Sequence, residues 1–123
     1  MRRRTVVAVL VLSGLAPQLF GQRVVASTSW TAAFARAAGA TEISVIAPAE
    51  LQHPPEYDIK PSDLEAVRRA SLVVYAGYEK FAQRLAETAA GSARTLQVFT
   101  DNSPATVKAQ ARPIAAALGT TAA

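Results

Sequence analysis

The chain has 123 residues, of which 50% are hydrophobic, and it carries a formal net charge of +4. This length gives room for one domain, and the apolar content is sufficient for a buried core, which excludes a disordered chain. The sequence contains no cysteine, which excludes disulfide bonds and thiolate metal ligands. A metal ion bound by this chain would therefore use nitrogen and oxygen ligands.

The N-terminus has the pattern of a signal peptide. Arg2–Arg4 form a basic segment, and the run Thr5–Leu15 is apolar. We predict that residues 1–21 are a signal peptide, cleaved after Gly21 or Ala16, and that the rest is exported to the periplasm or the extracellular face of the membrane. A retained N-terminal anchor is the alternative, although the run is shorter than the roughly 18–20 residues of a spanning helix.

Most of the net charge lies in that N-terminal segment. Three of the thirteen basic residues are Arg2–Arg4, so that cleavage leaves ten basic residues against nine acidic ones. Basic and aromatic side chains also do not interleave as they do in nucleic-acid binders. We therefore expect no nucleic-acid partner.

Short apolar runs alternate with helical patterns over the rest of the chain. Such alternation is typical of parallel strands connected by helices. The run at residues 72–75 is entirely apolar, as expected for a central strand that is buried on both faces. We predict an α/β fold with a four-stranded parallel sheet flanked by helices, a single lobe over residues 22–119 with a tail at 120–123. The expected strands are residues 23–27, 43–47, 72–75 and 95–99.

The first two helices have clear boundary signals. The first begins near residues 28–30 and ends at Gly39. Its predicted apolar face consists of Ala33, Phe34 and Ala37. The second begins at Ser62, which has the S-x-x-E spacing of a capping box with Glu65.

The last two helices are also predicted from their apolar spacing. The stripe of the third ends at Gly91 and consists of Phe81, Ala82, Leu85, Ala86 and Ala89. The fourth has Ser103 as its N-cap and Pro104 in its first turn, and it ends at Gly119.

A proline-rich loop between the second strand and the second helix contains the only histidine, His53. Polar residues follow every predicted strand, and ligands of open parallel sheets bind at this carboxyl edge. The candidate metal ligands are His53 and the carboxylates of Glu79 and Asp101. The alternatives are an ordinary surface histidine and acidic residues placed by helix starts and turns.

Enzyme functions find little support. The sequence has no G-x-S-x-G elbow, no dinucleotide fingerprint and no phosphate-binding P-loop. Ser27 or Ser29 could join His53 and Asp58 in a hydrolase, but we expect that the protein is not an enzyme.

Four segments together resemble the N-terminal lobe of the solute-binding proteins that serve zinc and manganese ABC importers. The most specific is LQHPPEYDIKPSDLEAV, and the others are VVASTSWTAAFARAAGA, ASLVVYAGYEKFAQRL and TDNSPATVKAQARPIAAALGT. In that family a histidine ahead of a tyrosine and a Pro-Ser-Asp helix start is a metal ligand, and His53, Tyr57 and Pro61–Asp63 match it. Many members have a second histidine after the fourth strand, where this chain has TDNSP. Asp101 is the candidate replacement there.

The resemblance implies one lobe of a two-lobed protein that binds a zinc or manganese ion for transport. It implies an ABC-transporter permease as partner and a second lobe that has no counterpart in these residues. Alone, the lobe would bind metal weakly, because tight zinc sites use three or four protein ligands. The alternative is a lobe that has lost the metal site and binds another solute or a protein.

Overall fold

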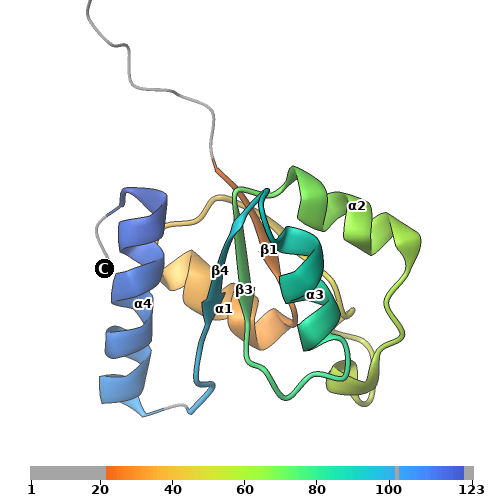
Figure 1. Cartoon of the computed structure of the whole chain (residues 1–123). Coiled ribbons are helices and arrows are strands. Elements are labelled where there is room, and N and C mark those ends of the chain that lie inside the picture. Colours follow the sequence, from red (N-terminus) through yellow and green to blue (C-terminus); the bar gives the residue numbers. More distant parts are fainter. Residues whose placement is uncertain (1–21, 102, 121–123) are drawn as a thin grey trace, which may run out of the picture.

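A computed structural model describes residues 22–101 and 103–120 of the chain (Figure 1). The expected signal peptide lies outside these residues, as do Asn102 and residues 121–123. The sheet has four parallel strands in the order β2-β1-β3-β4, which confirms the predicted fold class. The strands are β1 (Arg23–Ala26), β2 (Glu42–Val45), β3 (Leu72–Tyr75) and β4 (Arg94–Gln97).

Three of the strands end one or two residues before their predicted ends. The difference arises because side chains remain buried where regular pairing has stopped. Val98 lies after β4, yet it is buried and its backbone N–H donates to the Tyr75 carbonyl at 2.8 Å. Ser27 follows β1 in the same way and donates to the Val74 carbonyl at 2.9 Å. Apolar patterning therefore reports burial better than it reports strand ends.

Helices cover both faces of the sheet and create two hydrophobic cores (Figure 1). On one face, α1 (Ser29–Ala37) and α4 (Pro104–Leu118) pack on Val24, Leu72 and Val74. On the other face, α2 (Pro61–Arg69) and α3 (Ala82–Ala89) pack on Val25 and Val73. Successive strand residues point to opposite faces, which explains why β1 and β3 are apolar throughout.

The predicted apolar face of α1 was wrong by about one residue. Ala33 and Ala37 are exposed, and the buried residues of this helix are Thr31, Ala32, Phe34 and Ala35. The error arose because the helix contains alanine on every side, so that composition does not distinguish the faces. Thr31 is buried because it takes part in the cap, in which its backbone N–H and side chain both bond Thr28.

The predicted capping box at Ser62 was also wrong. Helix α2 begins at Pro61, whose fixed φ suits the first helical position. Ser62 therefore lies inside the first turn. The N-cap residue is Lys60, and the side chain that accepts its backbone N–H belongs to Asp63, with a distance of 2.8 Å to Oδ2. The same oxygen accepts the Tyr57 hydroxyl at 3.0 Å, so the cap also anchors the loop that precedes the helix.

Helix α4 has the predicted ends. Ser103 caps it through a hydrogen bond from the Thr106 backbone N–H at 3.3 Å, and Gly119 ends it in the left-handed region with a φ of 69°. At 15 residues it is the longest helix that the structure describes. Within residues 22–101 and 103–120, no helix has the length and apolar character needed to span a bilayer.

The core under α4 gives a stability prediction. Ile114 is completely buried against the sheet. Ile114→Ala should lower the free energy of unfolding by about 2–5 kcal/mol, because the removed atoms leave a cavity. Urea unfolding followed by circular dichroism measures this change. Lys108→Ala, at an exposed position of the same helix, should stay within about 0.5 kcal/mol of the wild type. Equal effects of the two variants would contradict this packing.

The loop anchor gives a pH prediction. Burial, together with the hydrogen bond and charge of Asp63, raises the pKa of Tyr57 above its ordinary value. The contribution of the protonated Tyr57 hydroxyl to stability is therefore fully present below the unfolded-state pKa of about 10. It is lost as pH rises through the higher folded-state pKa. We expect Tyr57→Phe to flatten the alkaline fall of the unfolding free energy. Asp63→Asn should lower the pKa of Tyr57, measured by ultraviolet titration. An unchanged alkaline slope in Tyr57→Phe would refute this role.

Candidate functional site

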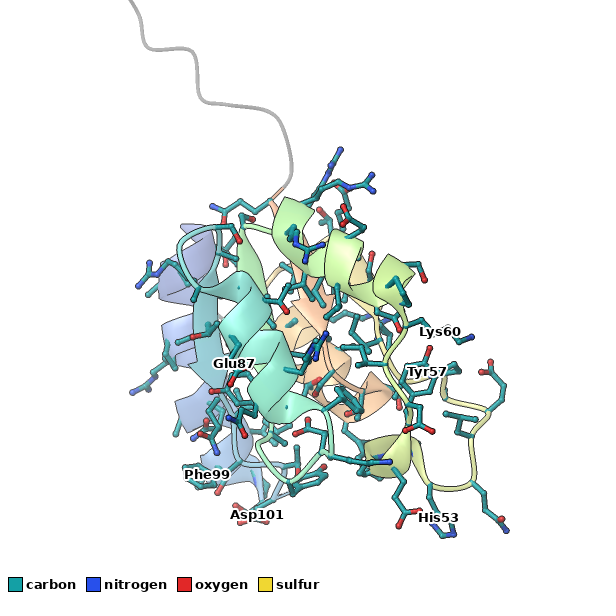
Figure 2. The ribbon with its side chains drawn as sticks, turned by 45° about the vertical axis from the view of Figure 1, so that its right-hand side comes forward. His53, Tyr57, Lys60, Glu87, Phe99 and Asp101 are labelled. Carbon is teal, nitrogen blue, oxygen red and sulfur yellow. The ribbon has the colours of Figure 1, made fainter. Side chains whose placement is uncertain are left out.

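The loops at the carboxyl edge of the sheet contain all three predicted metal ligands. His53 is exposed at the start of a short 3-10 turn, η1 (Pro54–Glu56), at the lower end of the view in Figure 2. The turn is closed by hydrogen bonds from the backbone N–H groups of Glu56 and Tyr57 to the carbonyls of His53 and Pro54, at 3.0 and 3.1 Å. Proline at two successive positions restricts this turn further. The imidazole is thus presented to solvent by a stiff segment.

The η1 turn is attached to the loop that follows β3. The Lys80 backbone N–H donates to the Pro55 carbonyl at 2.8 Å, and the ring of Tyr57 meets that of Phe81 edge to face, with centroids 6.1 Å apart. The Lys80 ammonium also lies 2.9 Å from a carboxylate oxygen of Asp58, which raises the pKa of Lys80. This ion pair is exposed, and such pairs contribute little. The backbone bond and the aromatic contact therefore provide most of the attachment.

Glu79 lies in the interior, and only 4% of it is exposed. Its Oε1 accepts hydrogen bonds from the Ser27 hydroxyl and from the Ala76 backbone N–H, the latter at 2.9 Å. Its Oε2 accepts the Gly77 backbone N–H at 2.6 Å. The carboxylate thus organises the loop after β3 from within.

Gly77 suits this loop chiefly through its backbone conformation, and the end of the Gln97 side chain lies close to it. Its φ of +102° lies in the region that side chains disfavour, and a Cβ there would come within 2.3 Å of the Gln97 side-chain nitrogen. Gln97 in turn donates to the Ala76 carbonyl at 3.0 Å. The loop is therefore packed closely against the end of β4.

Asp101 is exposed in the loop before α4. Its Oδ1 accepts the Ser103 backbone N–H at 3.0 Å, and its Oδ2 accepts the Thr106 hydroxyl at 3.2 Å. These contacts are those of an aspartate that supports a helix start. The exposed position leaves further lone pairs open to solvent.

The three predicted residues share an edge without forming a cluster. Figure 2 shows His53 and Asp101 at the same end of the molecule, on different loops and separated across the view. Among the residues that the structure describes, no three or more His, Cys, Asp or Glu side chains form a group that could hold a metal ion. Metal ligation by His53, Asp101 and Glu79 stays a prediction.

The form of the hydrolase alternative that uses Ser27 finds no support in the geometry. The Ser27 hydroxyl is fully buried and bonds Glu79 and Thr31, while the Asp58 carboxylate pairs with Lys80. Among the described residues, no hydrogen bond or ion pair joins the Ser27 hydroxyl or the Asp58 carboxylate to His53. The contacts of Ser27 with Glu79, and of Tyr57 with Asp63, were not predicted.

Known structures have the same fold. Zinc-bound AdcA from Streptococcus pneumoniae matches with a TM-score of 0.57 and 16% identity over 63% of this chain and 18% of that one. A manganese-bound periplasmic metal-binding protein from Candidatus Liberibacter asiaticus matches with a TM-score of 0.54 and 14% identity, over 68% of this chain and 32% of that one. For AdcAII of S. pneumoniae the TM-score is 0.59 and the identity is 17%, over 81% of this chain and 46% of that one.

The chain thus spans less than half the length of these three structures. No curated protein matches the sequence. A family model described as zinc-uptake complex component A, periplasmic, matches residues 24–122, which is nearly all of the chain outside the expected signal peptide. The chain therefore belongs to the family of the periplasmic component A of zinc-uptake complexes.

Proposed function

We propose that this chain is the N-terminal lobe of an exported solute-binding protein that carries a divalent transition metal, zinc or manganese, to the permease of an ABC importer. The family match and the shared fold of zinc- and manganese-bound proteins support this function. The family's periplasmic description agrees with the expected signal peptide over residues 1–21.

The position of His53 carries the proposal. It is the only imidazole in the chain, and it is exposed at the carboxyl edge, where open parallel sheets bind ligands. Its loop is restrained on one side by the Lys80 bond to Pro55 and on the other by the Tyr57 bond to Asp63. A restrained ligand loses little conformational freedom when it binds an ion. The side chain is thus ready to contribute one nitrogen ligand.

One nitrogen is not sufficient for a tight site. Zinc sites use three or four protein ligands, and positions without a protein ligand are filled by water. Asp101 is the candidate for a second ligand at this edge, since its exposed carboxylate offers the oxygen that zinc and manganese both accept. We therefore propose weak binding by this lobe alone, with the remaining ligands provided by a second lobe.

An alternative function follows from exposed aromatic side chains. Trp30, Tyr78 and Phe99 are 52%, 51% and 67% exposed. A hollow of about 150 Å³ beside Trp30 is lined by Ala33, Phe34 and Val107. Contiguous exposed apolar surface marks contact sites for proteins or small molecules, and the hollow beside Trp30 is the candidate for such a site here. These features favour, as the second candidate, an interaction lobe that does not bind metal.

Nuclear magnetic resonance of the His53 ring tests the metal proposal. We expect zinc to shift the His53 ring signals of the isolated lobe, and manganese to broaden them. His53→Ala should raise the dissociation constant for zinc, measured by calorimetry, by at least about tenfold.

Gln52→Ala provides the matched control, since this exposed side chain precedes His53 in the same loop and should leave zinc binding unchanged. Ring signals that do not respond to either metal would support the interaction lobe instead. Tight zinc binding that persists in His53→Ala would show that other residues form the site.

A further inference from the structure

Four polar residues are buried in the part of the chain that the structure describes, and Glu79 is the only one that is acidic or basic. Burying a carboxylate is unfavourable unless hydrogen bonds compensate for the lost water. Here the Ala76 and Gly77 backbone N–H groups and the Ser27 hydroxyl all donate to it. Such charge-assisted bonds are stronger than those between neutral groups. The carboxylate therefore joins the loop after β3 firmly to the end of β1.

The network continues into α1. Because the Ser27 proton is donated to Glu79, the Thr31 hydroxyl is the donor to the Ser27 oxygen, 3.1 Å away, and it accepts the Thr28 backbone N–H at 3.1 Å. Thr31 is completely buried, like Ser27. The loop after β3 is thus tied to a strand end and to a helix start that are themselves parts of the core.

The two residues after Glu79 contact the loop that contains His53. The Lys80 backbone N–H bonds the Pro55 carbonyl, and Phe81, itself buried, packs against the ring of Tyr57. Pro55 is only two residues from His53. A shift of the loop after β3 would consequently displace the η1 turn and the imidazole with it.

We propose that Glu79 is a positioning residue, which holds the loop after β3 in place so that Lys80 and Phe81 fix the turn that presents His53. Both of its carboxylate oxygens accept hydrogen bonds in the interior, and direct ligation of a metal ion by Glu79 is the alternative that the experiment below separates from this role. The consequence for metal affinity rests on the proposed function of His53.

The test compares Glu79→Gln with Glu87→Gln, an exposed glutamate of α3 that contacts only its own helix through Gln83. In metal-free Glu79→Gln, the amide nitrogen takes the place of one carboxylate oxygen. Its N–H groups then face donors and can no longer accept their hydrogen bonds. We expect hydrogen exchange of the Lys80 amide to accelerate by at least about tenfold, since its bond to Pro55 opens more often. Signals of His53 and Tyr57 should shift too. Glu87→Gln should match the wild type.

The zinc titration provides the second readout. In Glu79→Gln the dissociation constant should rise about three- to tenfold, while zinc still shifts the His53 ring, as expected for a residue that acts through another. A loss of zinc binding with an unchanged metal-free loop would identify Glu79 as a ligand and overturn the positioning role. An unchanged loop with unchanged affinity would overturn it as well.

The experiment also separates failure of the proposed function from failure of the positioning role. If zinc does not affect His53 in the wild type, the proposed function fails, while the Lys80 exchange rate still decides whether Glu79 holds the loop. If Glu79→Gln does not fold, Ser27→Ala removes one of the three donors and should accelerate Lys80 exchange in the same direction by a smaller factor. No acceleration in a folded Ser27→Ala protein would then refute the role.

Discussion

The burial of both faces of a parallel sheet is the constraint on which the rest of this structure depends. Residues Val24–Ala26 and Leu72–Val74 are almost completely inaccessible, because helices pack on either side of them. Parallel strands require a crossover between each pair, so that all four strands end at the same edge. That edge brings together loops that are far apart in the sequence, including those with His53 and Asp101 (Figure 2).

The polar groups at this edge divide into two kinds. The carboxylates of Glu79 and Asp63 accept backbone N–H groups and hydroxyls, and they organise the loops in which they lie. His53 is exposed, and its backbone rather than its ring closes the local turn. Glu79 is buried and Asp63 is half-buried, whereas the imidazole of His53 and the carboxylate of Asp101 are open to solvent. The proposal of a metal-facing lobe follows from this division.

The proposal that one lobe alone binds metal weakly rests on membership of the zinc-uptake family and on the part of its relatives that the chain spans. The chain spans 18–46% of the length of the three proteins of known structure that share its fold. The rings of Trp30, Tyr78 and Phe99 are exposed as well. In the proposed function, a second lobe that closes over this edge would provide the further ligands.

The sequence by itself determined the α/β class, the four strands, the helix ends at Gly39 and Gly119, and the loop that contains His53. These features follow from local causes: apolar runs, the absence of a side chain in glycine, and the rigidity of proline. Only the tertiary structure decided that Glu79 is buried and that its carboxylate accepts hydrogen bonds from Ser27, Ala76 and Gly77. An acidic residue near a helix start has the same local pattern whether it binds a metal, caps the helix or is buried. Its contact with Ser27 joins residues 52 positions apart, and no local pattern records such a contact.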